Sequence, residues 1–176
     1  MNTKKYKMVL RKSLNQTLNL KIISNIVNSI LENPSEFEIL FKLMSDRNVK
    51  ISWRAAWVCD KIAEIQPLFF CQSHIDDIVS RTISNSHEGF RRSCLSILYH
   101  LPLQPVNVPL LNSCFEWMIS RESSIAIQAL SIKIIHRYCI IEPDIKHELK
   151  AYLENYETER VSVGILALRK KILKTL

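Results

Sequence analysis

Glycine is nearly missing from this sequence: only Gly89 and Gly164 occur among 176 residues, whereas an average chain contains about 7% glycine. Phosphate-binding loops, dinucleotide-binding fingerprints and nucleophile elbows all need glycines at fixed spacings. The chain therefore lacks the residues from which those motifs are built. We predict no catalytic residues and no cofactor, and hence a protein that is not an enzyme.

The chain also lacks the paired cysteines of a disulfide-stabilised secreted domain, because its cysteines are odd in number and widely scattered. They are Cys59, Cys71, Cys94, Cys114 and Cys139. Cys71 and His74 have the two-residue gap used in zinc sites, but no second Cys or His pair lies at ligand spacing. We therefore predict reduced thiols, a cytoplasmic protein and no metal site.

No uncharged stretch is suited to crossing a membrane. The longest segment without Lys, Arg, Asp or Glu covers residues 93–115 and contains Pro102, Pro105 and Pro109, which interrupt a continuous helix. At the start of the sequence, only three apolar residues lie between the first lysines and Arg11, so no export signal is expected. These features predict no membrane partner.

Positive charge is concentrated at both ends of the chain. Residues 1–21 carry six basic and no acidic residues, and residues 160–176 carry five basic and no acidic residues. The segment between them contains 13 basic and 17 acidic residues and is mildly acidic, although the whole chain has a formal net charge of +7. Solvated charges at the ends of a helical stack explain this distribution most simply.

Apolar residues recur at three- and four-residue spacings along almost the whole chain, which predicts helices and no strands. The six prolines lie between these periodic segments, where they mark helix ends or first turns. The predicted helices cover residues 4–14, 19–31, 35–45, 49–65, 74–84, 88–100, 107–120, 123–140, 144–155 and 158–175.

From residue 35 onward the helices repeat in pairs. Aligning the second helix of each pair superposes Ala56, Ser93, Ala129 and Gly164, in steps of 37, 36 and 35 residues. A small residue at this position lets two helices cross closely, so we predict that these four residues lie in the structural core. A fixed period in this range is typical of a solenoid, in which no repeat can bury its apolar face alone.

The period and the small residue of each second helix resemble the HEAT and armadillo class of helical repeats, and the similarity covers residues 35–176. The resemblance implies an all-α, right-handed α-α superhelix, that is, a HEAT-like solenoid. We expect a single domain over residues 1–176. It would comprise N-terminal cap helices at residues 1–34 and helical hairpins at residues 35–66, 73–101, 107–141 and 144–176.

Residues 50–61 are also similar to small uncharacterised bacterial HEAT-like proteins, some of which are labelled adenylosuccinate lyases. The signature loop of that lyase superfamily is a Gly-Ser-Ser run followed by Met, Lys and Asn. Here Ser123 and Ser124 are followed by Ile, Ala, Ile and Gln. The resemblance therefore implies no lyase activity.

Trp53 and Trp57 lie one helical turn apart on the same helix face. They either pack in the structural core or form a stacking platform for a nucleobase or a hydrophobic peptide, and we favour core packing. Asp60 is an acid near the end of the same mostly apolar segment. We expect a hydrogen bond or ion pair between Asp60 and an adjacent repeat, because an uncompensated buried charge is costly.

A set of basic residues is the candidate partner-binding site. In the repeat alignment Arg54 and Arg91 are equivalent, and the resemblance to HEAT-like proteins implies that both face a concave groove. There they could grip phosphates or acidic side chains. Alternatively, they only pair with nearby acids such as Asp46 and Glu88. The full set is Arg54, Arg91, Arg92, Lys50, Arg47 and Arg121.

Two functions remain open at this point. The first is a non-catalytic scaffold whose concave face receives an unidentified protein or peptide. The second is a nucleic-acid binder resembling the HEAT-like DNA alkylation-repair glycosylases, in which a basic wall follows the phosphate backbone and Asp60 would be the acid in the groove. The mildly acidic middle of the chain favours the scaffold, and the sequence does not predict an oligomeric state.

Overall fold

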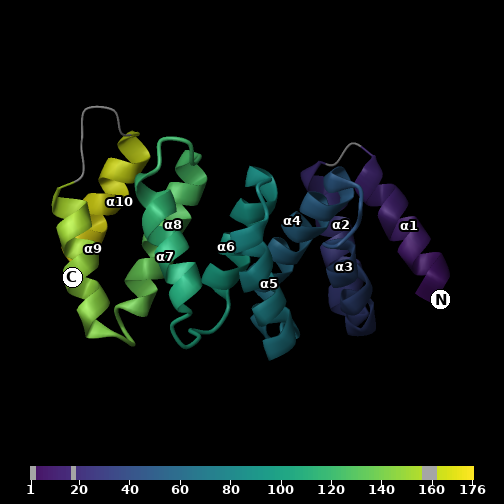
Figure 1. Ribbon diagram of the computed structural model, residues 1–176. Helices are drawn as coiled ribbons and strands as arrows, with labels where there is room; N and C mark the ends of the chain where they lie inside the picture. Colours follow the sequence, from purple (N-terminus) through teal and green to yellow (C-terminus); the bar gives the residue numbers. More distant parts are fainter. Residues whose placement is uncertain (1–2, 17–18, 156–161) are drawn as a thin grey trace.

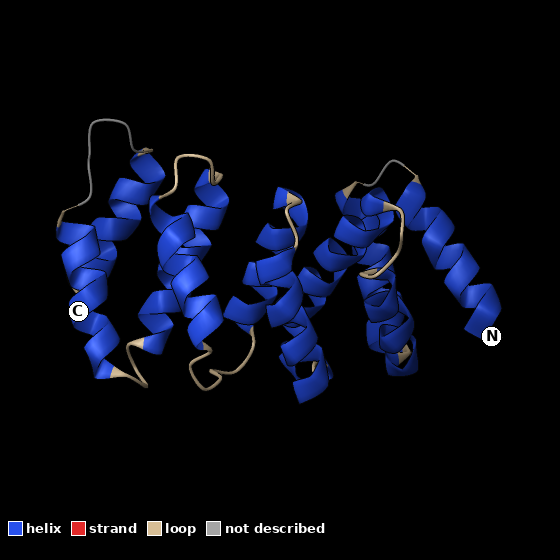
Figure 2. Cartoon of the chain, viewed as in Figure 1, coloured by secondary structure: helices blue, strands red, loops and turns tan. Residues whose placement is uncertain are grey.

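The computed structural model describes residues 3–16, 19–155 and 162–176, and this part of the chain is built from α-helices and two short 3-10 helices without any strand (Figure 1, Figure 2). None of the described helices is both long and apolar enough to cross a lipid bilayer. The α-helices are α1 (Thr3–Asn15), α2 (Leu20–Glu32), α3 (Phe37–Leu43), α4 (Val49–Ile65), α5 (Gln72–Ser84), α6 (Glu88–His100), α7 (Val108–Ile119), α8 (Ile125–Tyr138), α9 (Pro143–Glu154) and α10 (Val163–Leu173), and the 3-10 helices are η1 (Pro34–Glu36) and η2 (Pro67–Phe69).

The helices form a row of hairpins, each made of a first and a second helix: α3 with α4, α5 with α6, α7 with α8, and α9 with α10 (Figure 1). The second helices pack directly on one another, α4 on α6, α6 on α8 and α8 on α10. At the N-terminal end, α1 packs on α3 and α4, and α2 packs on α4. The predicted all-α helical solenoid is confirmed, and α4 and α6 have the predicted bounds.

The second helices begin at N-caps that fix the true register of the repeats. These N-caps are Asn48, His87, Ser124 and Ser162, at intervals of 39, 37 and 38 residues. The side chains of Asn48, His87 and Ser162 each accept a hydrogen bond from a main-chain N–H in the first turn, which satisfies a donor that the helix itself leaves unpaired. The intervals exceed the 35 to 37 residues expected from the sequence because the aligned small residues do not lie at equivalent positions: Ala56, Ser93, Ala129 and Gly164 follow their N-caps by 8, 6, 5 and 2 residues.

The small buried residues at equivalent positions of the second helices are therefore not those expected from the sequence. Seven positions after the first three N-caps lie Ala55, Cys94 and Ser131, and all three have 0% exposed surface. Ala56 and Ser93 are buried as predicted. Among the other predicted core residues, Ala129, Trp53 and Trp57 are half-buried.

Gly164 does not lie at a helix crossing, so its predicted place in the core is wrong. It is exposed in the first turn of α10. Among the residues that the structure describes, a Cβ atom added to Gly164 would approach only the Ser162 Oγ, at 4.0 Å. The small side chain at this position therefore has no packing role.

Replacing Gly164 with alanine should stabilise the protein by about 0.5 kcal/mol, because alanine loses less backbone entropy in a helix and no neighbour obstructs its Cβ. Urea unfolding followed by circular dichroism would measure the change. Gly89→Ala is the matched control: its Cβ would lie 3.1 Å from His87 Cε1, so the same substitution should give no such gain. Equal stabilisation by both variants would contradict the packing described here.

Two hydrophobic core clusters meet at α6. The first extends from α1 to α6 and receives Phe90, Cys94 and Ile97 from that helix. The second extends from α6 to α10 and receives Leu95. Leu98 packs, partly buried, against both clusters. The helix α6 therefore joins the two halves of the stack.

Candidate partner-binding face

The solvent-facing sides of α4, α6 and α8 form a surface, here called the outer face, whose residues are exposed or half-buried. Three contacts show that it is continuous across three hairpins. The Trp53 ring stacks on His87, the Asp60 carboxyl group hydrogen-bonds to Ser96, and the Lys133 ammonium lies 5.3 Å from the centre of the Tyr99 ring. The outer face comprises Trp53, Trp57 and Asp60 of α4, Arg92, Ser96 and His100 of α6, and Ala129, Lys133 and His136 of α8.

Two stacked tryptophans form the apolar part of the outer face. The ring centroids of Trp53 and Trp57 are 6.0 Å apart with an interplanar angle of 15°, and those of Trp53 and His87 are 5.9 Å apart at 20°. Both tryptophans pack against the first core cluster and keep part of their surface accessible. The rings are therefore held rigidly by the core while they still offer an apolar surface to a partner.

Asp60 lies on the same face one turn beyond Trp57, and the expected hydrogen bond to an adjacent repeat is present, since its partner is Ser96 of α6. Burial raises the pKa of the Asp60 carboxyl group, although Ser96 and the nearby Lys61 and His100 act in the opposite direction. Within the described residues, Asp60 Oδ1 is buried and has no hydrogen-bond partner. A buried acceptor without a hydrogen-bond partner is costly, above all when it is charged, which agrees with the raised pKa of this carboxyl group.

Two of the predicted partner-binding arginines hold the ends of helices. The Arg54 guanidinium donates to the main-chain oxygen of Leu14, at 2.9 Å, at the end of α1. The Arg91 guanidinium donates to the oxygens of Thr82, at 3.3 Å, and Asn85, at 2.7 Å, at the end of α5. Cations are favoured at helix C-termini because they satisfy carbonyl groups and complement the helix dipole. These contacts show a structural role for both side chains, while their role in partner binding stays a prediction.

The predicted equivalence of Arg54 and Arg91 is wrong. Arg54 lies six residues after its N-cap and Arg91 four residues after its own. The true equivalents of Arg91 are Ser52 and Gln128, and each donates to a carbonyl at the end of the first helix of its own hairpin. Ser52 Oγ donates to Met44 O at 2.7 Å and Gln128 Nε2 donates to Ser120 O at 2.8 Å. This position therefore closes the hairpins instead of forming an arginine ladder.

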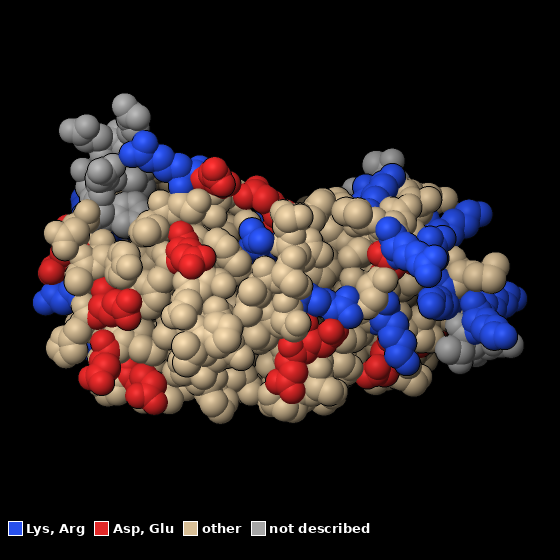
Figure 3. Space-filling view, viewed as in Figure 1, with Lys and Arg blue, Asp and Glu red and all other residues tan. Residues whose placement is uncertain are grey.

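The structure does not gather the other predicted basic residues into one patch. Arg92 is exposed on the outer face, Arg47 and Lys50 are exposed at the turn between α3 and α4, and Arg121 is exposed in the turn between α7 and α8. In the view of Figure 3, the densest group of Lys and Arg lies at the end of the molecule formed by α1, and acidic side chains gather around α9. The outer face itself carries charges of both signs.

Two arginines that the sequence did not single out, Arg137 and Arg169, have the same structural role. Arg137 donates to the carbonyls of Leu98, Tyr99 and Leu101 at the end of α6, and Arg169 donates to the last carbonyls of α9. The sequence separation between arginine and carbonyl ranges from about 15 to 39 residues. Because the separation is not constant, no sequence spacing would have identified them.

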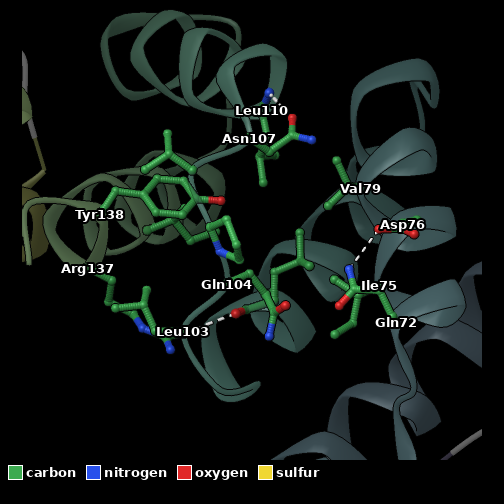
Figure 4. Close-up of a pocket in the computed structure, with 14 residues that line it drawn as sticks. Gln72, Ile75, Asp76, Val79, Leu103, Gln104, Asn107, Leu110, Arg137 and Tyr138 are labelled. Carbon is green, nitrogen blue, oxygen red and sulfur yellow. Dashed lines mark hydrogen bonds between the residues drawn. The ribbon is translucent and has the colours of Figure 1, made fainter. Parts of the chain in front are cut away.

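A cavity of about 240 Å³ lies between α5, the linker at residues 101–107, α7 and α8 (Figure 4). Its wall includes both apolar and polar side chains, and two of the polar ones are engaged within the protein: Gln72 Nε2 donates to Asp76 at 2.9 Å, and Arg137 donates to the Leu101 oxygen after the end of α6. Burial raises the pKa of the Tyr138 hydroxyl at the same cavity. We do not assign the cavity a ligand.

Comparison with known proteins gives one match. The family model for the HEAT repeat domain matches residues 10–176, which covers the second half of α1 and every later helix. No curated protein and no solved structure matches the chain. Within the described residues, no three or more His, Cys, Asp or Glu side chains are placed to hold a metal ion.

Proposed function

The chain belongs to the HEAT repeat family, and from this premise we propose that it is a non-catalytic scaffold that binds a protein or peptide through the outer face of α4, α6 and α8. HEAT repeats generally serve as protein-interaction scaffolds, and the family is typically non-catalytic. The proposal for this chain adds the surface that is used and the chemistry of the partner.

The observation that carries the proposal is the presence of an apolar anchor and two cations on one face. The half-buried rings of Trp53 and Trp57 are of the residue type that contributes most binding energy at protein interfaces. On the same face, Arg92 is exposed and Lys133 is half-buried beside the Tyr99 ring. A partner segment with an apolar side chain for the tryptophans and acidic groups for the two cations would complement both features.

The distribution of cations supports a protein partner over a nucleic acid. Arg54 and Arg91 are engaged with main-chain carbonyls, and the outer face mixes Arg92 and Lys133 with Asp60. A surface that follows a phosphate backbone needs cations that are free to replace counterions at many positions. We therefore keep the nucleic-acid binder as an outcome of the experiment below.

The test reverses charge on the outer face without touching the helix caps. The double variant Arg92→Glu with Lys133→Glu should weaken binding of the partner at least about tenfold, because it places repulsive charges across the interface. Affinity capture would identify a stoichiometric partner, and titration of that purified partner followed by tryptophan fluorescence would measure the affinity. Two of the three tryptophans of the chain lie on this face, so binding there should change their emission.

The matched control is Lys42→Glu with Lys146→Glu, which makes the same charge change on the first helices α3 and α9. It should leave the affinity unchanged. Equal affinity for wild type and the outer-face variant would show that another surface binds. If instead duplex DNA binds at 50 mM salt with affinity that falls steeply as salt rises, and the outer-face variant loses that binding, the nucleic-acid function replaces the scaffold.

A further inference from the structure

Cys71, His74 and Glu38 form a chain of three interacting side chains away from the outer face. Cys71 is the N-cap of α5, His74 lies in the first turn of that helix, and Glu38 belongs to α3. Cys71 Sγ lies 3.3 Å from His74 Nδ1, and His74 Nε2 lies 2.8 Å from Glu38 Oε1. The two outer groups contact opposite ring nitrogens, so they cannot converge on one metal ion, and the arrangement is that of a nucleophile, a base and a group that orients the base.

The hydrogen bonds determine which nitrogen of His74 carries the proton. His74 Nδ1 accepts from the main-chain N–H of Cys71 at 3.3 Å, so in the neutral ring the proton is on Nε2, where it is donated to Glu38. The Cys71 thiol lies 3.3 Å from the same nitrogen, so the main-chain N–H and the thiol share Nδ1 as an acceptor, and the N–H releases it when Nδ1 takes the thiol proton. This is the tautomer that a base needs in order to accept the proton of Cys71.

The imidazole is held in this position by an aromatic cluster. His74 is only 7% exposed, and its ring meets Phe37 edge-on at 5.5 Å and packs on Phe41 at 4.2 Å. Phe70 makes a further edge-on contact with the same ring. Packing on three sides fixes the His74 ring beside Cys71. The side chain therefore loses no further conformational entropy when it accepts the proton.

The sulfur of Cys71 lies where a thiolate is favoured. The Ser73 hydroxyl is 3.1 Å from Cys71 Sγ, and the main-chain N–H groups of Ser73 and His74 at the start of α5 also point to the sulfur. Together these donors lower the pKa of the Cys71 thiol, with the Ser73 hydroxyl as the largest cause, against a small opposing effect of the Glu38 charge. A thiol in such a position reacts faster than an ordinary one.

The other cysteines lack this environment. Cys59, Cys94 and Cys114 are buried and Cys139 is half-buried, whereas Cys71 is exposed. Burial raises the pKa of the Cys94 and Cys114 thiols to about 12. Cys71 is thus the exposed thiol and has donors around it, whereas three of the others are buried in the core and Cys139 is half-buried.

We propose that Cys71 is a site of covalent modification, at which the thiol, with His74 as its base and Glu38 as the group that positions that base, attacks low-molecular-weight disulfides. The thiol proton moves from Sγ to His74 Nδ1, and the thiolate attacks one sulfur of the disulfide. The new S–S bond forms as the old one breaks, and the departing thiolate takes the proton from His74. The products are a mixed disulfide on Cys71 and one free small thiol, so no other oxidant is needed.

The test uses 2,2′-dithiodipyridine, a small neutral disulfide whose leaving group is detected by its absorbance. In the folded wild-type protein one thiol, mapped to Cys71 by mass spectrometry, should react at pH 7 at least about fivefold faster than N-acetylcysteine. The midpoint of its rate–pH profile should lie below that of N-acetylcysteine. Cys71→Ser should remove the fast phase and keep the melting temperature, because serine is also a good N-cap.

Two further variants test whether His74 acts as a base for Cys71 or only caps α5. His74→Gln keeps a side chain that can reach back to the N-cap N–H, yet it should slow the fast phase about tenfold and raise the midpoint. Glu38→Gln should also slow the reaction. If Glu38 acted only through its charge, its removal would instead lower the midpoint and speed the reaction, because that charge raises the thiol pKa.

Asp76→Asn is the matched control, since it neutralises a carboxylate of α5 that is bonded to Gln72 and not to His74. Its rate and pH profile should equal those of wild type. The proposal is overturned if Cys71 reacts no faster than N-acetylcysteine, if the fast thiol maps to another cysteine, or if Glu38→Gln and Asp76→Asn behave alike.

Discussion

Replacing Leu95 with alanine is expected to lower the free energy of unfolding by about 3–5 kcal/mol, the cost of removing a fully buried leucine side chain whose cavity cannot collapse. Leu95 has 0% exposed surface. It is the buried residue that α6 contributes to the second core cluster, while the other buried apolar residues of this helix face the first. Urea unfolding followed by circular dichroism would measure the loss.

The same variant should also make unfolding less cooperative. In a stack of repeats each unit is stabilised by its neighbours, so a cavity at α6 weakens the contact through which the two halves stabilise each other. A shallower or biphasic transition is expected. Leu20→Ala, which makes the same chemical change at a side chain that is 71% exposed, should change stability by less than about 0.5 kcal/mol. A similar small change for Leu95→Ala would show that α6 does not couple the two halves.

The helices themselves could be predicted from the sequence because each has a local signal. Apolar residues at three- and four-residue spacings predict amphipathic helices, and the ends of α4 and α6 agree with the structure to the residue. Asn107 was predicted to begin a helix, and its side chain accepts a hydrogen bond from Leu110 N as an N-cap. These features depend on residues that are close in sequence, where propensity and capping act directly.

The register of the repeats could not be predicted reliably, because a helix offers several alignments that look alike. Small residues occur at several positions of one helix, for example Ala55 and Ala56 in α4 or Ser93 and Cys94 in α6, and their pattern does not select one of them. An alignment on small residues therefore matches Gly164 with Ala56 and places Arg91 opposite Arg54. The correct register follows from the N-caps, and the importance of His87 as one of them is not evident from its residue type, since the usual N-caps are Ser, Thr, Asp and Asn.

The candidate functional residues could be predicted from the sequence even less well than the register. His74 and Glu38 are 36 residues apart and meet only because α3 and α5 belong to consecutive hairpins. The sequence did draw attention to Cys71 and His74, but as a possible zinc pair, and Glu38 had no signal of its own. Likewise, Asp60 was recognised as an unusual acid, whereas the missing partner of its Oδ1 is a property of the packed structure.

Replacing Arg137 with methionine is expected to cost about 2–3 kcal/mol of stability. Its guanidinium donates to the main-chain oxygens of Leu98, at 3.1 Å, and Leu101, at 2.8 Å, and also to that of Tyr99. A hydrogen bond from a charged group contributes more than a neutral one, and a carbonyl left without a donor pays its desolvation cost. Methionine keeps much of the apolar stem, so the change removes mainly the donors and the contact of the guanidinium with the Tyr99 ring, at 5.6 Å.

The damage should be local as well as global, because these carbonyls end α6 at the linker to the third hairpin. Hydrogen exchange measured by mass spectrometry should become faster in the last turn of α6 and in residues 101–107 before it changes in α1 or α2. Arg92→Met is the control. Arg92 is exposed on α6, and its replacement should change the free energy of unfolding by less than about 0.5 kcal/mol. If both variants lose the same small amount of stability, Arg137 acts only as a surface charge, and apolar packing alone holds the junction between the second and third hairpins.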